Sequence, residues 1–121
     1  MLSILKRLKA LGDGTRLKVL ALLSVRPCCV CELAEVLKLS QPTMTRHLQK
    51  LEEAGLVRHQ RIRNFQIYSL SPEDEEARAL LELVLGNLED TPEMKQLKER
   101  LKSLKIGPEF LRKRCGDGHR L

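Results

Sequence analysis

Residues 37–55 read LKLSQPTMTRHLQKLEEAG, and this stretch decides the fold. Ser40 is a favourable N-cap for a helix with a proline in its first turn, and Gly55 is a favourable residue to end that helix. A shorter segment with apolar residues at helical spacing, roughly residues 29–37, precedes it across a tight turn. Two short helices joined by such a turn predict a helix-turn-helix, although many helical hairpins share the pattern.

The flanking segments extend this unit. Apolar periodicity and capping residues predict further helices over residues 1–11, 13–23, 71–88 and 91–104. Two β-rich segments predict a hairpin with strands at 56–61 and 65–70 and a turn at 63–64. The expected fold is mainly α with a β-hairpin wing: a dimeric winged helix-turn-helix of four helices, two strands and a helix, with an extra C-terminal helix.

Charge is segregated along the chain. Residues 38–63 carry six basic and two acidic side chains, a net charge of +4, whereas residues 72–93 carry one basic and eight acidic side chains, a net charge of −7. A positive segment that coincides with a helix-turn-helix and its wing fits an electrostatic footprint on DNA. Solvated surface charge alone would give the same pattern.

The residues that would meet DNA follow from the helical period. Met44, Leu48 and Leu51 share one face of the second helix, so the opposite face is expected to enter the major groove. Arg and Gln suit contacts with base edges there, hydroxyls at the helix start suit a phosphate, and wing arginines suit phosphates or the minor groove. The candidate DNA-binding residues are Ser40, Gln41, Thr43, Arg46, His47, Gln49, Lys50, Arg58, Arg61 and Arg63. His47 lies at the edge of the apolar face and can instead pack or cap locally.

The predicted domain is single, because 121 residues leave no room for a second core. We expect DNA binding and dimerisation over residues 1–106 and a basic, flexible tail over 107–121. The helix after the wing has a broad apolar stripe that suits either a core helix or a helix that pairs with a second copy of the chain. The helix-turn-helix context favours the homodimer.

Three of the four cysteines, Cys28, Cys29 and Cys31, fall within four positions. Nothing at the N-terminus resembles a signal peptide, and no stretch approaches the ~20 apolar residues of a membrane span. We therefore expect a cytoplasmic protein with no membrane partner and with reduced thiols. Cys29 and Cys31 lie at the start of a predicted helix and close to Arg26. Both features favour the thiolate form of the cysteines, which binds soft metals. The alternative is that the cysteines are small buried hydrophobic residues.

Several motifs together resemble the ArsR/SmtB family of metal-sensing repressors: CVCEL at 29–33, LSQP at 39–42, RHL at 46–48 and LEEAGLV at 51–57. The resemblance covers about residues 8–72, and the CVC segment is similar to the arsenic-sensing branch. It implies a homodimeric winged helix on a double-stranded DNA operator, which is released when Cys29 and Cys31 bind arsenite or antimonite or another thiophilic metal. Ala34 stands where such sensors often have a third cysteine, so either Cys28 or Cys115 is a third ligand or two thiols suffice.

The proposed switch carries a geometric expectation. Residues i and i+2 of a helix point about 200° apart, so joint ligation by Cys29 and Cys31 would distort the first turn of the helix that supports the reading helix. Such binding would weaken the DNA complex, and DNA would weaken ligand binding in return.

Three other functions remain open from the residues alone. Oxidation of Cys28, Cys29 or Cys31 could release DNA in a redox-sensing repressor on the same fold. A small thiol enzyme or metal carrier is a second alternative, but the cysteines lack the C-x-x-C spacing of redox motifs, and we expect no enzyme. A constitutive, sequence-independent DNA binder is the third.

Overall fold

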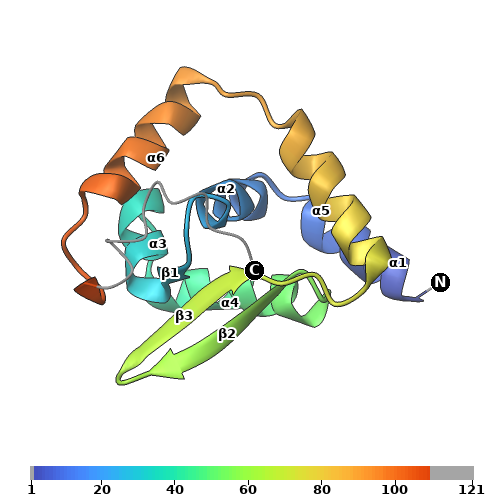
Figure 1. Cartoon of the computed structure of the whole chain (residues 1–121), viewed down its shortest axis with the longest axis horizontal. Helices are drawn as coiled ribbons and strands as arrows, with labels where there is room; N and C mark the ends of the chain where they lie inside the picture. Colours follow the sequence, from blue (N-terminus) through green and yellow to red (C-terminus); the bar gives the residue numbers. More distant parts are fainter. Residues whose placement is uncertain (1, 110–121) are drawn as a thin grey trace.

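The computed structural model describes residues 2–109, which form six helices and three strands (Figure 1). The helices are α1 (Leu2–Leu11), α2 (Gly14–Leu23), α3 (Val30–Leu37), α4 (Gln41–Glu53), α5 (Glu75–Asn87) and α6 (Pro92–Ser103). The strands are β1 (Cys28–Cys29), β2 (Val57–Ile62) and β3 (Phe65–Leu70). The predicted winged helix-turn-helix is confirmed, with α3 and α4 as the helix pair and β2 and β3 as the wing.

Local capping positions α4 as the sequence predicts. The Ser40 hydroxyl accepts a hydrogen bond from the backbone N–H of Thr43 at 3.2 Å, which satisfies one of the free N–H groups of the first turn. At the other end the chain turns at Gly55, whose φ of 74° favours glycine. A Cβ added at Gly55 would overlap the side chain of Glu73, so the close approach of these two segments also requires a glycine.

Aliphatic side chains from α2, α3 and α4 fill the core. Leu20, Leu33, Met44, Leu48 and Leu51 are completely buried. The last three form the inner face of α4, as its apolar period predicts. Because burial of one such side chain stabilises the fold by about 1.5–3 kcal/mol, this packing fixes the orientation of α4 and leaves its other face exposed.

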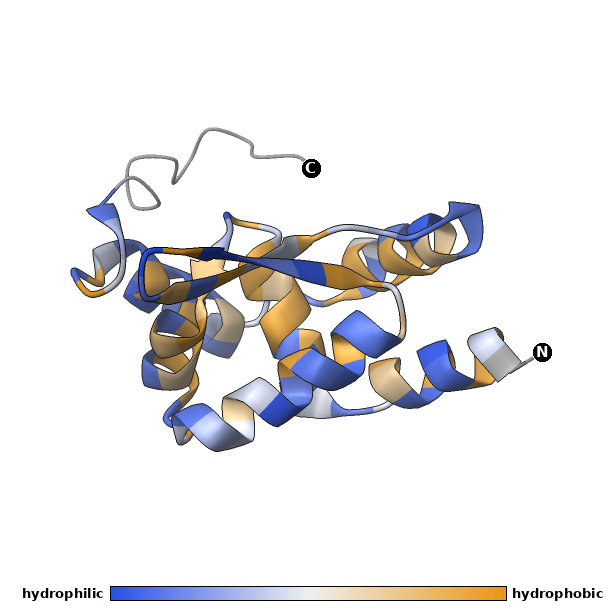
Figure 2. Cartoon of the chain, turned by 90° about the horizontal axis from the view of Figure 1, so that it is seen from below, coloured by the Kyte–Doolittle hydropathy of each residue, from blue (hydrophilic) through white to orange (hydrophobic). Residues whose placement is uncertain are grey.

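The sheet contains one more strand than predicted. Its order is β1-β3-β2, and all neighbours are antiparallel. In β1, Cys28 pairs with Tyr68 and Cys29 pairs with Ile67. Successive side chains of a strand point to opposite faces, so Cys28 joins the main core while Cys29 joins a small outer cluster with Ile67. Figure 2 shows that hydrophilic residues predominate at the tip of the wing.

The start of α5 differs from the prediction. The sequence predicts a helix from residue 71, where Ser71 has the residue type of an N-cap, but the N-cap is Asp74, whose carboxylate accepts a hydrogen bond from the Ala77 N–H at 2.9 Å. The backbone N–H groups of Ser71 and Glu73 are instead bonded to the carbonyls of Leu56 and Gly55, at 3.0 and 2.8 Å. These two bonds hold residues 71–73 against the end of α4 and the start of β2, so α5 begins beyond them.

Arg7 joins α1 to the end of α4 and the start of α5. It is almost fully buried, donates to the carbonyl of Ala54 at 2.9 Å, and pairs with Glu73, Asp74 and Glu76 at 2.7–3.0 Å. The pKa of Asp74 is held below its ordinary value, chiefly by the backbone N–H group at the start of α5 and next by Arg7. This cluster fixes the end of the molecule that contains both α1 and α5 (Figure 1).

Candidate DNA interface and cysteine site

The outward face of α4 carries the polar side chains that the sequence predicts. Arg46, Gln49 and Lys50 are exposed, on the side opposite the buried methionine and leucines. At the helix start, Ser40 donates to the Thr43 hydroxyl at 2.9 Å, and Arg46 donates to the same hydroxyl at 3.3 Å. These hydroxyls and the nearby arginine form a polar surface at a helix N-terminus, which suits a phosphate or a base edge.

His47 belongs to α4 and contacts the start of α2. It is half-buried, and its Nδ1 lies 3.2 Å from a guanidinium nitrogen of Arg16. Arg16 also donates to the carbonyl of Ala10 at 2.7 Å and lies 3.9 Å from the Asp13 carboxylate. The pKa of Asp13 is lowered, first by its hydrogen bond from the Arg16 N–H. The structure therefore gives His47 a protein partner that sequence reasoning did not identify.

The wing is tied to α4 and presents three arginines. His59 on β2 lies 2.8 Å from Glu52 of α4, and its ring is 5.1 Å from that of Tyr68 on β3. Arg58, Arg61 and Arg63 are exposed. Arg63 adopts the left-handed conformation, with φ of 57°, in the predicted two-residue turn. The wing arginines thus project from a hairpin whose position relative to α4 is fixed.

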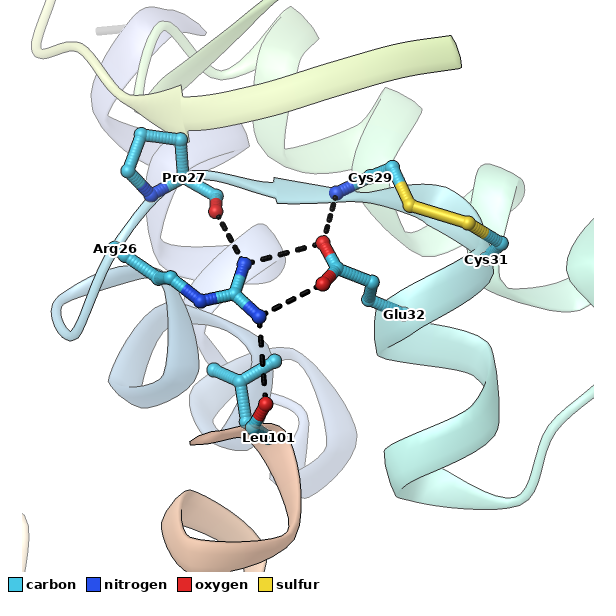
Figure 3. Close-up of a disulfide and its surroundings, with 6 residues drawn as sticks. All are labelled: Arg26, Pro27, Cys29, Cys31, Glu32 and Leu101. Atoms are coloured by element: carbon cyan, nitrogen blue, oxygen red, sulfur yellow. Dashed lines mark hydrogen bonds and ion pairs between the residues drawn. A yellow bond between two sulfur atoms is a disulfide. The ribbon is translucent and has the colours of Figure 1, made fainter. Parts of the chain in front are cut away.

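Cys29 and Cys31 are joined in a disulfide at the start of α3 (Figure 3). The prediction of reduced thiols does not hold for this pair. The expected distortion of the first helical turn is also wrong, because α3 begins at Val30 and Cys29 is its N-cap in an extended conformation, with φ −80° and ψ 160°. The two side chains therefore meet beside an intact helix, with their Cα atoms 5.4 Å apart.

Beneath the two cysteines lies an ion pair that sequence reasoning missed. Arg26 and Glu32 are both completely buried, and their closest nitrogen and oxygen atoms are 2.7 Å apart. Glu32 also accepts a hydrogen bond from the Cys29 N–H at 3.0 Å, and Arg26 donates to the carbonyls of Pro27 and Leu101 (Figure 3). The sequence analysis expected Arg26 to stabilise the thiolates. In the structure its guanidinium instead pairs with the Glu32 carboxylate. The spacing of Glu32 three residues after an N-cap was the available signal, since it matches half of a capping box.

Cys28 is not brought to the other two cysteines. Its thiol is buried in the main core and donates to the Arg26 carbonyl at 3.3 Å. Cys115 lies outside the described residues. Within residues 2–109, no cluster of three or more His, Cys, Asp or Glu side chains is placed to hold a metal ion, and no helix is long and apolar enough to cross a bilayer.

A pocket of about 500 Å³ connects the cysteines to the DNA-facing elements. Cys29 and Cys31 form one wall and the start of α4, with Gln41 and Thr45, forms another. The wing forms the third side with Arg61, Asn64, Phe65 and Gln66. A group bound at the cysteines would therefore lie directly between the start of the reading helix and the wing.

A second pocket, of about 470 Å³, lies on the other side of α4. Lys50 and Glu53 line it from α4, and Lys6 and Lys9 line it from α1. It places Lys50 among other cations, which suits the predicted contact with a phosphate.

Comparison with known proteins agrees with this architecture. The family described as "Bacterial regulatory protein, arsR family" matches residues 13–59, which contain the helix-turn-helix and the cysteine pair. An arsenical resistance operon repressor from Staphylococcus aureus is 36% identical over 81 residues, which cover 67% of this chain and 72% of that protein. The chain belongs to the ArsR family of regulatory proteins.

Two further similarities refine this assignment. The arsenic resistance transcriptional regulator ArsR1 of Pseudomonas putida is 42% identical over 66 residues, 54% of this chain, and the match spans about half (52%) of that protein's length. Among solved structures, a homodimeric winged helix-turn-helix DNA-binding domain from Mycobacterium bovis, described as a possible ArsR-family transcriptional regulator, superposes with a TM-score of 0.61. It is 29% identical and covers 74% of this chain and 84% of that one. The two curated relatives are named as a transcriptional regulator and an operon repressor, in agreement with the sequence-based expectation of a regulator rather than an enzyme.

Proposed function

We propose that the chain is a cytoplasmic, homodimeric transcriptional repressor that leaves its DNA operator when the reduced Cys29–Cys31 pair binds arsenite or antimonite. The observation that carries this proposal is the shared pocket, which has the two cysteines on one side and the start of α4 and the wing on the others. Relatives named as an arsenic resistance transcriptional regulator and an arsenical resistance operon repressor support the choice of ligand.

The exposed face of α4 supports DNA binding. Arg46 and Gln49 are free to reach base edges in the major groove, and the wing arginines are free to reach the flanking backbone. Ser40, Gln41, Thr43 and Lys50 would bind phosphates. Such contacts position the protein on the duplex but do not distinguish one base sequence from another.

Exposed leucines support the homodimer. Leu5 and Leu8 of α1 are 47% and 53% exposed, and Leu83 of α5 is 62% exposed. Large apolar side chains exposed at one end of a small protein favour association. We expect Leu83→Glu to convert the dimer into a monomer and to weaken operator binding. Sedimentation velocity measures the first effect; a variant that sediments as wild type would place the interface elsewhere.

Ligand binding would act on DNA through the shared pocket. Arsenite, As(OH)₃, would condense with the two thiols, form two As–S bonds and release two water molecules, with arsenic remaining trivalent. The bound group would occupy space next to Gln41 and Arg61, two of the candidate DNA contacts. A coupling free energy of roughly 1–3 kcal/mol would lower operator affinity about 5–150-fold.

The test is a fluorescence anisotropy titration of the chain on its own upstream promoter DNA at fixed salt. Arsenite, antimonite, cadmium, zinc and peroxide are added in turn to protein kept reduced, except in the peroxide arm. We expect arsenite and antimonite to release DNA from wild type and from Cys28→Ala, which keeps the sensor pair. Cys29→Ser and Cys31→Ser should bind DNA and ignore both metalloids; continued release from these two variants would refute the proposal.

The disulfide favours redox sensing as a second candidate function. Peroxide would oxidise one thiolate to a sulfenic acid, which the second thiol would attack to give the disulfide and water. Release of DNA by peroxide but not by arsenite, and its reversal by a reductant, would establish this function instead of metalloid sensing.

A further inference from the structure

The outward face of α4 is bordered by a different element on each side. On one side, Gln41 and Thr45 share a pocket with the wing. On the other side, Lys50 and Glu53 share the second pocket, of about 470 Å³, with α1. Both α1 and β2 pack directly against α4. The proposed DNA surface is therefore a helix with a flank on each side, and only one of these flanks is the wing.

The shape of DNA makes the same demand on both flanks. A helix that enters the major groove, which is about 12 Å wide, has a sugar–phosphate strand on each side. The wing supplies exposed positive charge on its own flank, with Arg58, Arg61 and Arg63. The phosphates of the other strand would face the surface between α4 and α1.

That surface is cationic. Its pocket is lined by one acidic side chain and four basic side chains, which are those of Lys6, Lys9, Arg16 and Lys50. The three lysines are exposed, and none of them forms an ion pair within residues 2–109. Arg7, on the same helix, is instead buried and paired with three carboxylates. The buried cation of α1 thus serves the fold, whereas the exposed cations are available to an anion from outside.

Arg16 fixes the end of α1 relative to α4. Its guanidinium donates to the carbonyls of Lys9 and Ala10 at 3.2 and 2.7 Å, and it lies 3.2 Å from Nδ1 of His47 on α4. The backbone that carries Lys9 is therefore held in place beside the reading helix. Only the lysine side chains would need to become ordered when a phosphate binds, which keeps the entropic cost of the contact small.

We propose that α1 is a second DNA-binding element, in which Lys6 and Lys9, together with Lys50, bind the sugar–phosphate strand on the side of α4 opposite the wing. This inference rests on the proposed DNA binding and homodimer. Leu5 and Leu8 of α1 belong to the exposed apolar surface assigned to the dimer, and Leu5 also lines the pocket. The lysines of the two protomers therefore lie toward the two-fold axis, over the phosphates between the two half-sites, and the wings lie at the outer flanks.

The first experiment measures operator affinity against salt concentration by fluorescence anisotropy, on the reduced full-length protein without inducer. The variant Lys6→Ala with Lys9→Ala removes four lysines from each dimer, so the slope of log affinity against log salt should become shallower by about 3–4. Wild type should accordingly lose on the order of 100-fold more affinity than this variant between about 50 and about 200 mM salt. The control Lys95→Ala with Lys102→Ala removes the same charge from exposed positions of α6, which packs against α2 and α3, and should keep the wild-type slope.

Two further measurements distinguish direct contact from a general loss of positive charge. Glu53→Gln removes the carboxylate of the pocket, so it should tighten operator binding, an effect that damage to the fold would not produce. Neutral methylphosphonate linkages between the half-sites should weaken wild type but leave Lys6→Ala with Lys9→Ala unaffected, because that variant has already lost the partner charges. Neutral linkages at the outer flanks should weaken both proteins equally.

The outcomes separate this inference from the proposed function. An unchanged salt slope in Lys6→Ala with Lys9→Ala, equal sensitivity of both proteins to the central neutral linkages, or no gain of affinity in Glu53→Gln would each overturn the role of α1. Dissociation of that double variant into monomers in sedimentation velocity would also overturn it, because the lysines would then belong to the interface between protomers. In all of these cases wild type would still bind its operator and leave it with arsenite; failure of wild type to bind the operator would instead overturn the proposed function.

Discussion

Replacement of Glu32 by leucine is expected to destabilise the folded chain by about 3–5 kcal/mol, because it leaves the Arg26 guanidinium charged, buried and without its carboxylate. Both side chains are completely buried, and their closest atoms are 2.7 Å apart, so water cannot take the place of the lost partner. Domains of this size are typically stable by about 5–15 kcal/mol, so the variant would lose a large fraction of its stability.

The double variant Arg26→Met with Glu32→Leu provides the matched comparison. It removes both charges, and replacement of a whole buried ion pair by apolar side chains is often neutral or stabilising. It also removes the partner of the Cys29 N–H and of the Pro27 and Leu101 carbonyls, which costs about 1–3 kcal/mol for each group left unsatisfied. We therefore expect the double variant to be more stable than Glu32→Leu alone, although it has lost more hydrogen bonds.

Urea unfolding of the reduced proteins, at one fixed protomer concentration, measures these differences through the transition midpoint and the m-value. Equal stability of Glu32→Leu and wild type would mean that the pair is solvated in solution. The single variant Arg26→Met completes the cycle. If the losses of Arg26→Met and Glu32→Leu simply add in the double variant, the charge argument is refuted, since independent sites add and a coupled pair does not.

Three further predictions follow from the fold and the DNA-facing surface. Gly55→Ala should lower the free energy of unfolding in urea by about 1–3 kcal/mol, because of the positive φ and the overlap with Glu73. Gly86→Ala, at an exposed helical position with open space around it, should raise the free energy of unfolding by about 0.5–1 kcal/mol. The lowered pKa of Asp74 means that its contribution to stability is complete above the unfolded-state pKa of about 3.9 and is lost as pH falls through the folded-state value. Asp74→Asn should accordingly flatten the acid limb of a plot of stability against pH; an unchanged limb would contradict this reasoning. Arg46→Ala should weaken operator binding by about 1–3 kcal/mol and relax sequence preference, whereas Arg61→Ala should weaken binding to all sequences and reduce the salt slope by about 1, as anisotropy titrations at several salt concentrations would measure.

The helix-turn-helix was predictable because its signals are local. The cap at Ser40, the apolar period of α4 and the turn at Gly55 each involve neighbouring residues, and the structure has all three. The two-residue turn of the wing was predictable for the same reason.

What the sequence did not reveal depends on contacts between distant segments. A strand of two residues has no period to read, and β1 exists because Cys29 pairs with Ile67. Arg26 of the buried pair donates to the Leu101 carbonyl of α6, a contact between distant segments that no local pattern indicates. The cap of α5 was placed too early because the rule at Ser71 was satisfied locally, while its N–H was already bonded to the Leu56 carbonyl.

The pleat of β1 places the side chains of two adjacent cysteines on opposite faces of the strand. Cys28 faces the core and is constrained by packing, whereas Cys29 faces the outer cluster and the pocket that opens beside the wing. A substitution at Cys29 would change the outer cluster and the lining of the pocket, whereas a substitution at Cys28 would disturb the main core that also contains Met44 and Leu48 of α4. Under the proposed function, the ligand chemistry of the pocket could therefore change while the scaffold that holds α4 stays the same.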